Sequence, residues 1–163
     1  MSLTELFDES LIELNGNFSS QAAFFKAVSL KLQNLQYVKN GFFEKIQERE
    51  KKFPTGLKTK SFNVAIPHTD PEYVNRSFIY VIRMRNSLPF CQMGTDPLDG
   101  DFVYPKLIFL LGVTKGELQL SILQSLMKLF SHEEQMTNLL EFEEAKDFVQ
   151  RIREFLSCSN FVI

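Results

Sequence analysis

KLIFLLGV, residues 106–113, is apolar at nearly every position and decides the fold class. A strand with one face in water alternates apolar and polar side chains, so this run predicts a central strand that is covered on both faces. SFIYVIRM, residues 77–84, predicts a second strand. Strands interspersed with helical patterns along the chain then predict an α/β sandwich, in which helices flank both faces of a mixed β-sheet.

Two shorter segments complete the predicted sheet. The apolar piece Leu11–Leu14 fits an edge strand, and the turn-forming residues 15–17 follow it. Residues 61–67 alternate at first and then become apolar, which predicts a strand with every second side chain on one face. Residues 94–100 are polar and glycine-rich enough to form a loop.

Helical periodicity appears in five places. A helix capped by Ser19 or Ser20 is expected to end near Gln33, with an approximate apolar stripe along one side. The stripe consists of Ala22, Phe25, Val28, Leu30 and Leu32. The other helices are expected from Phe42 to Lys52, from Gly116 through Leu129, from His132 after a capping box at Ser131–Glu134, and from Glu143 to Ser157.

Composition narrows the possible function classes. The chain has 163 residues, enough for one domain, which we expect over residues 1–163. Lys plus Arg number 18 against 20 for Asp plus Glu, and this balance gives no support to nucleic-acid binding. The only two cysteines, Cys91 and Cys158, form no spaced cluster, so neither a disulfide framework nor a zinc site is expected. Free thiols and an acidic N-terminus predict a cytoplasmic protein.

The chain has two histidines, and only one stands where chemistry is expected. His132 lies in the first turn of a predicted helix among glutamates, which is typical of a surface histidine. His68 follows Pro67 at the end of a predicted strand, where proline turns the chain out of the sheet. Ligands of open α/β sheets gather just beyond strand ends, so His68 is a candidate site residue.

Composition and spacing alone leave other interpretations of His68 open. It could be a structural histidine. A metal site would need more ligands than His68 and Asp70. A hydrolytic pair with Cys91 would need a nucleophile signature, and none is recognisable. Gly94 and Gly100 match no phosphate-binding loop, so the sequence implies no nucleotide cofactor.

Two neighbouring motifs carry a family resemblance. Residues 49–57 contain Arg-Glu and then Pro-Thr-Gly after a short gap, and residues 63–70 contain Ala-Ile-Pro-His. This combination resembles the enzyme IIA proteins of the bacterial sugar phosphotransferase system, fructose–mannitol family. The order of predicted elements also agrees over nearly the whole chain.

The resemblance implies a role for three residues. His68 would accept a phosphoryl group on Nε2 from the phosphohistidine of HPr and pass it to a cysteine of a IIB protein, while a nearby acceptor holds its Nδ1–H. Arg49 would pair with the phosphoryl oxygens. Thr55 would donate its hydroxyl there or stabilise the turn. Transfer between side chains is mostly a matter of positioning and charge, so we expect no metal and no cofactor.

One position departs from the pattern. Many fructose and mannitol members carry a second active-site histidine where alignment puts Gln119, which can donate a hydrogen bond but carries no charge. The galactitol-type IIA proteins resemble this chain there, in Phe53–Gly56 and in LPFCQMG at residues 88–94. The resemblance therefore implies transport of galactitol or a related polyol, with a IIC permease as an indirect partner.

Two alternatives to the transport role remain at this point. One is a regulatory module of the same fold that senses phosphorylation without feeding a transporter. The other is a purely structural role, which leaves the Ala-Ile-Pro-His motif without a purpose. For the carrier, Phe53 and Leu57 are candidates for an apolar docking patch, unless Phe53 belongs to the core.

Overall fold

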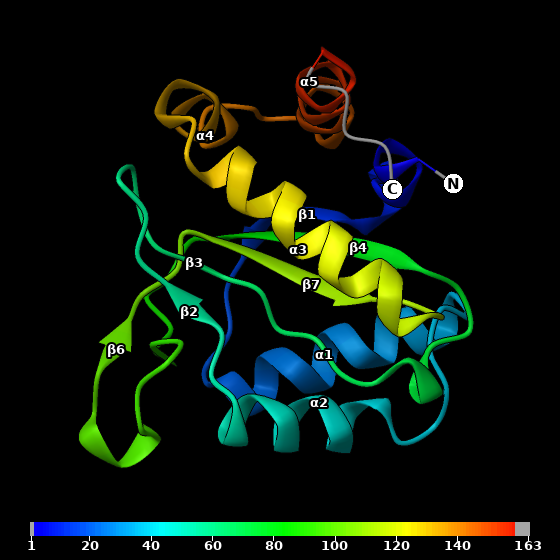
Figure 1. Cartoon of the computed structure of the whole chain (residues 1–163), viewed down its shortest axis with the longest axis vertical. Helices are drawn as coiled ribbons and strands as arrows, with labels where there is room; N and C mark the ends of the chain where they lie inside the picture. Colours follow the sequence, from blue (N-terminus) through cyan, green and yellow to red (C-terminus); the bar gives the residue numbers. More distant parts are fainter. Residues whose placement is uncertain (1, 159–163) are drawn as a thin grey trace.

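The computed structural model describes residues 2–158 and contains a five-stranded mixed sheet with strand order β1-β4-β7-β3-β2 (Figure 1). At its centre the antiparallel strands β4 and β7 lie side by side. β1 runs parallel to its neighbour β4, and β3 runs parallel to its neighbour β7. β2 pairs antiparallel with β3 at the other edge. The strands span Ile12–Gly16 (β1), Gly56–Leu57 (β2), Val64–Ala65 (β3), Phe78–Met84 (β4) and Leu107–Gly112 (β7).

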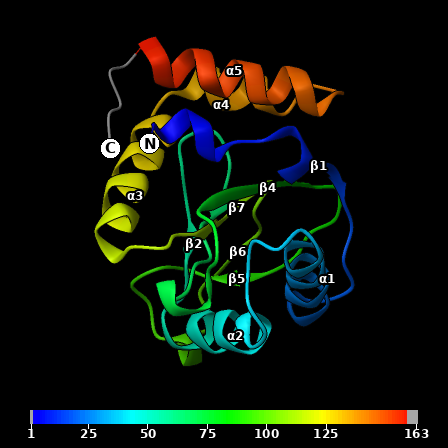
Figure 2. The ribbon, with the colours of Figure 1, turned by 90° about the vertical axis from the view of Figure 1, so that its right-hand side faces the viewer.

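Helices cover both faces of the sheet, as predicted (Figure 2). One face packs against α1 (Gln21–Asn34) and α2 (Phe42–Lys52). The other packs against α3 (Gly116–Phe130), α4 (Glu133–Leu139) and α5 (Ala145–Cys158).

The central strands supply side chains to both cores, which explains why KLIFLLGV is apolar at nearly every position. Ile108 and Leu110 of β7 pack toward α1 and α2, whereas Leu107, Phe109 and Leu111 pack toward the other three helices. Successive side chains of a strand point to opposite faces, so a strand buried on both sides needs apolar residues at every position.

The expected strand boundaries need correction at two places. Residues 15 and 16 belong to β1 and not to a turn. The segment 61–67 forms a ladder only at β3, because the Thr59 hydroxyl accepts the N–H of Phe62 and donates to its carbonyl, which turns the chain before the strand begins. Its alternate residues Phe62, Val64 and Ile66 nevertheless share one core, as predicted.

The stripe expected along α1 is partly wrong. Ser20 caps the helix as predicted, since its hydroxyl accepts the N–H of Ala23 at 3.0 Å. Leu30, however, is 58% exposed, and the buried face contains Phe24 and Ser29 instead. Leu30 and Leu32 are two residues apart, so they cannot lie on one side of a helix with 3.6 residues per turn.

Two further details were not predicted correctly. The hydroxyl of Ser131 donates to the carbonyl of Lys128, so it does not cap α4, which begins at Glu133. A hairpin of two short strands, β5 (Phe90–Cys91) and β6 (Phe102–Val103), encloses the loop predicted at residues 94–100. Strands of two residues are too short for a periodic pattern.

Short 3-10 helices fill several connections, and no membrane-spanning helix is present within residues 2–158. The 3-10 helices span Leu3–Leu6, Glu9–Leu11, Pro71–Tyr73 and Pro97–Asp99. In this part of the chain every helix is too short or too polar to cross a bilayer.

Gly112 of β7 gives a test of the central packing. A Cβ atom added there would collide with the ring of Phe78, whereas one added at Gly116 would meet no atom within 4 Å. We expect Gly112→Ala to lower the free energy of unfolding by about 1–3 kcal/mol, because overpacking forces side chains from their rotamers. Gly116→Ala is the matched control and should cause no loss. Urea unfolding of both variants measures the difference, and equal stabilities would contradict this packing.

Candidate functional site

His68 lies immediately after β3, where the strand ends against β7. The N–H of Leu111 donates to the carbonyl of Pro67 at 2.9 Å, and His68 forms an isolated parallel bridge with Leu111. Nδ1 of His68 lies 2.7 Å from the carbonyl oxygen of Ile66. A carbonyl oxygen can only accept, so Nδ1 carries the proton and the lone pair of the neutral ring is on Nε2.

The surroundings of His68 favour the neutral ring. Burial lowers its pKa below the ordinary value of 6.5, and the positive charge of Arg49 lowers it further. The hydrogen bond to Ile66 and the carboxylate of Asp70 oppose this shift without cancelling it. A neutral imidazole with a free Nε2 is a nucleophile at neutral pH.

Arg49 places a positive charge near His68, and within residues 2–158 no salt bridge joins its guanidinium to an acid. It extends from α2, and its guanidinium lies over the ring of Phe53, with Cζ 4.6 Å from the ring centroid. Its Nε is buried and has no hydrogen-bond partner among residues 2–158. Unpaired buried donors of this kind are rare in folded proteins and mark places where a ligand can bind.

A pocket of about 160 Å³ connects Arg49 with the segment that follows His68. One wall consists of Thr69 and Asp70, the two residues next in sequence to the histidine. The other comes from the second half of α2 and its C-terminal end, and its residues are Lys45, Glu48, Arg49, Lys52 and Phe53. Three of these seven lining residues are cations and two are acids, and a salt bridge of 3.4 Å joins Lys45 to Glu48.

The Thr55 hydroxyl faces a buried acid. It donates to Oε2 of Glu50 at 2.8 Å, and the Thr55 N–H donates to Oε1 at 2.9 Å. Two roles were expected for this hydroxyl, and the contact with Glu50 corresponds to the second, stabilisation of the turn. Burial raises the pKa of Glu50 to about 7, although both hydrogen bonds from Thr55 oppose the shift.

Glu50 is connected to His68 through the backbone. The carbonyl of Thr55 accepts the N–H of Ile66 at 3.3 Å, and the carbonyl of Ile66 holds the ring of His68. Sequence reasoning gave Glu50 no role. The signal that could have found it is an acid in the last turn of a helix, five residues before the threonine of a Pro-Thr-Gly turn.

Gln119 lies half-buried in the first turn of α3, the helix that follows β7. His68 forms its bridge with Leu111, near the C-terminal end of β7. His68 and Gln119 therefore both lie toward that end of the strand. Among residues 2–158 the Gln119 side chain has no hydrogen bond, so the structure shows none between it and His68.

The remaining candidates lie apart from this arrangement. His132 is exposed, and its ring lies edge-on to Phe155 with centroids 4.8 Å apart. Cys91 is a free thiol whose pKa is raised by burial, which argues against an activated nucleophile. No group of three or more His, Cys, Asp or Glu residues within residues 2–158 could hold a metal ion.

Comparison with protein families identifies the fold and its general role. The family "Phosphoenolpyruvate-dependent sugar phosphotransferase system, EIIA 2" matches residues 5–155. The chain belongs to this family. As an EIIA 2 domain it is a phosphotransferase component of that system. No curated protein matched the sequence significantly.

Solved structures agree with the EIIA 2 assignment. A protein from Streptococcus mutans named as PTS IIA (PtxA) superposes with a TM-score of 0.74 at 20% identity, covering 99% of this chain and 98% of the other. Nitrogen regulatory protein IIA-Ntr from Neisseria meningitidis superposes with a TM-score of 0.67 at 28% identity, covering 94% of this chain and 98% of the other. The Escherichia coli complex of enzyme IIA of mannitol with phosphorylated enzyme IIB superposes with a TM-score of 0.67 at 18% sequence identity. The match covers 91% of this chain and 95% of the other.

Glu50 gives a test of the site's electrostatics through the pH dependence of stability. Its pKa of about 7 lies above the ordinary 4.5, so the folded protein keeps a proton that the unfolded chain releases. This group's contribution to stability is therefore greatest below pH 4.5, falls as pH rises toward 7, and is lost above it. Relative to Glu50→Gln, the wild type should lose up to about 3 kcal/mol of unfolding free energy across this range.

Chemical denaturation between pH 4.5 and 8.5 measures that loss. Glu48→Gln is the matched control, because it changes an exposed carboxylate on the same helix and should keep the wild-type pH profile. Parallel profiles for wild type and Glu50→Gln would show that Glu50 is ionised throughout and would overturn the prediction.

Proposed function

We propose that this protein is a phosphocarrier that accepts a phosphoryl group on Nε2 of His68 from phospho-HPr and transfers it to a cysteine of a IIB protein. The observation that carries this proposal is the hydrogen bond from Nδ1–H to the carbonyl of Ile66, which leaves Nε2 as the nucleophilic nitrogen. Membership of the EIIA 2 family and the adjacent unpaired Arg49 support the same chemistry.

The transfer is a displacement at phosphorus. The Nε2 lone pair forms a new P–N bond while the P–N bond to the histidine of HPr breaks, and its electron pair returns to the donor imidazole. The ring of His68 then carries positive charge, which the Ile66 carbonyl stabilises through Nδ1–H. A IIB thiolate repeats the displacement by forming a P–S bond, and His68 leaves as the neutral imidazole.

Arg49 is proposed to stabilise the phosphoryl oxygens during both displacements. Its guanidinium has donors in a planar fork that matches two oxygens, and the ring of Phe53 restricts its orientation. Lys52 at the same pocket adds positive charge, whereas Lys45 is paired with Glu48. Charge on the transferring group is spread over three oxygens, so cations fixed around it favour the transition state.

The docking surface for HPr and IIB is proposed to centre on Phe53. This side chain is 55% exposed, so it does not belong to the core, and it borders the pocket beside His68. Leu57 is half-buried and packs against the core, which leaves part of it available. A small apolar centre with a charged rim suits weak, transient complexes. The mannitol IIA relative was solved in complex with phosphorylated IIB, which fits a IIB partner here.

The transported compound is proposed to be galactitol or a related polyol. The support comes from the sequence: Gln119 in place of a second histidine, Phe53–Gly56 before the Ala-Ile-Pro-His motif, and LPFCQMG at residues 88–94. A regulatory role is the second candidate, and the 28% identity to a nitrogen regulatory IIA-Ntr favours it. Phosphoryl transfer to purified galactitol IIB supports the first, whereas phosphorylation by HPr without transfer to any sugar IIB supports the second.

His68→Ala tests the phosphoryl acceptor. Intact mass is measured after incubation with phosphoenolpyruvate, enzyme I and HPr. The wild type should gain one acid-labile phosphoryl group and His68→Ala none, because Nε2 is removed. The variant should stay folded, since the β-bridge to Leu111 is made by the backbone.

His132→Ala is the matched control for that experiment. It removes the other histidine, which is exposed and lies on α4's N-terminal side, away from the motif. It should be phosphorylated like the wild type. Loss of phosphorylation in this variant, or a phosphorylated His68→Ala, would refute the assignment of His68.

Arg49→Ala tests the proposed stabilisation of the phosphoryl group. Transfer from phospho-HPr should slow by about 10- to 100-fold without stopping, because one set of charged donors is lost while the nucleophile remains. Lys51→Ala changes an exposed cation on the same helix that does not line the pocket, and it should transfer at the wild-type rate. Quenched-flow measurement of both variants decides the point, and equal rates would remove Arg49 from the mechanism.

A further inference from the structure

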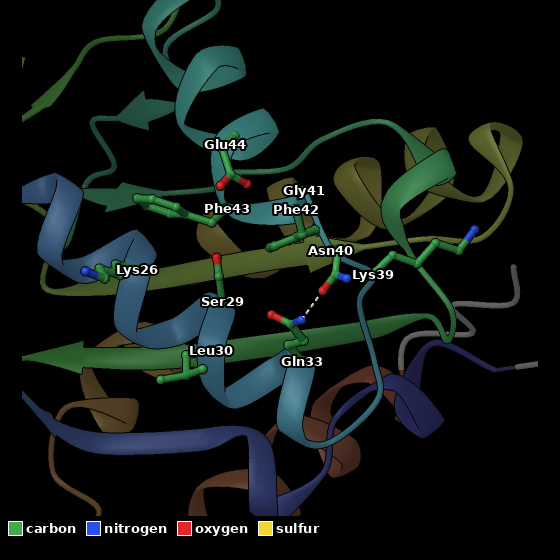
Figure 3. A pocket seen from close by; sticks show the side chains of 10 residues that line it. All are labelled: Lys26, Ser29, Leu30, Gln33, Lys39, Asn40, Gly41, Phe42, Phe43 and Glu44. Carbon is green, nitrogen blue, oxygen red and sulfur yellow. Dashed lines mark hydrogen bonds between the residues drawn. The ribbon is translucent and has the colours of Figure 1, made fainter.

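A second pocket lies between α1 and the first turn of α2 (Figure 3). Its volume is about 370 Å³, and it shares no lining residue with the pocket beside His68. One wall is a helical stripe of α1 whose members occupy positions i, i+3, i+4 and i+7. The other is residues 39–44, which end the α1–α2 connection and begin α2. The stripe consists of Lys26, Ser29, Leu30 and Gln33.

The floor of this pocket contains a polar group without a partner. Ser29 is only 4% exposed, and its Oγ has no hydrogen-bond partner among residues 2–158. Figure 3 shows the hydroxyl directed from α1 across the gap toward α2. Burying a hydroxyl without a hydrogen bond is unfavourable, so a ligand that supplies the missing hydrogen bond would be stabilised here.

The opposite wall offers further donors. The N-cap of α2 is Gly41, which adopts φ 90° and has no side chain to bond the first-turn N–H groups. The N–H of Phe42 donates to the carbonyl of Lys39 at 3.3 Å, so the N–H groups of Phe43 and Glu44 are the ones left without a backbone acceptor. The helix dipole makes this end partially positive. Phosphate groups bind at such helix ends through these N–H groups.

Two lysines stand at the margins of the pocket. Lys26 and Lys39 lie at its two ends, the Lys39 ammonium donates to the carbonyl of Glu72 outside it, and Glu44 is the single acid among the lining residues. The side chains of Gln33 and Asn40 are hydrogen-bonded to each other, with the Gln33 amide donating. The amide nitrogen of Asn40 therefore remains a donor for a bound group.

We propose that this pocket binds a phosphate group, held by the hydroxyl of Ser29 and the N–H groups of Phe43 and Glu44. The phosphate is either free inorganic phosphate or the phosphate of a small monoester. Binding makes and breaks no covalent bond. It uses none of the residues proposed for transfer through His68, so each proposal can be tested independently of the other.

An NMR titration of the full-length 15N-labelled protein tests this site. Inorganic phosphate is added at constant ionic strength, and glycerol 3-phosphate and glycerol form parallel arms. Both phosphates, but not glycerol, should shift the backbone amides of Phe43 and Glu44 in a saturable manner. A response to the monoester alone would assign the site to esters. Shifts confined to the neighbours of His68, or no saturable shift, would overturn the proposal.

Ser29→Ala separates a ligand contact from a structural one. It should weaken phosphate binding by about fivefold or more, because a hydrogen bond to a charged group is lost. The melting temperature without phosphate should stay the same or rise, since an unsatisfied hydroxyl is removed. Ser125→Ala is the matched control in α3, where the hydroxyl bonds the carbonyl of Ser121, and it should leave binding unchanged. Unchanged binding in Ser29→Ala would overturn the proposal.

Glu44→Gln tests the charge of the ligand. Removing the only acid of the pocket should tighten phosphate binding about two- to fivefold, because its repulsion at the helix N-terminus is lost. A neutral polyol or an ammonium ligand would lose an acceptor in this variant and bind less tightly. Weaker phosphate binding by Glu44→Gln would therefore contradict an anion site.

Discussion

The hydrogen bond from Nδ1–H of His68 to the carbonyl of Ile66 determines which ring nitrogen is free, and the rest of the site depends on it. Three further contacts fix the position of that carbonyl. Leu111 of β7 holds the carbonyl of the intervening Pro67, Thr55 holds the N–H of Ile66, and the buried carboxyl of Glu50 holds Thr55. The imidazole is therefore positioned mainly by backbone groups, whose geometry the central sheet sets.

Much of this arrangement follows from the sequence because it depends on burial and on proline. A segment such as residues 106–113 has to be a doubly covered strand, since few other environments accept so many consecutive apolar side chains. Pro67 has to end the neighbouring ladder, and a residue placed directly after that end is available for chemistry. These two constraints predict the layer architecture and make His68 a candidate, and the resemblance carried by the Pro-Thr-Gly and Ala-Ile-Pro-His motifs is what selects it.

The rest depends on contacts that leave no periodic pattern. The partnership of Glu50 with Thr55 joins a helix end to a turn, and an acid in a helix rich in Glu and Lys gives no sign that it is buried. The two-residue strands β2, β5 and β6 are defined by their partners across the sheet, which a local pattern does not contain. The burial of Ser29 could not be predicted from the sequence either, because serine on a helix is usually exposed.

The charge state of Glu50 connects the buried network with the chemistry of Arg49. The two residues are neighbours on α2, yet the carboxyl of Glu50 bonds to Thr55 and forms no ion pair with the guanidinium. A pKa of about 7 leaves roughly half of this acid neutral near pH 7, so its negative charge opposes that of Arg49 less than a fully ionised carboxylate would. The positive charge of Arg49 lowers the pKa of the His68 ring, and in the proposed mechanism it also attracts the phosphoryl oxygens. A fully ionised acid at this position would weaken both effects of the Arg49 charge. The burial of Glu50 therefore helps to keep the ring of His68 neutral, although the two side chains share no hydrogen bond.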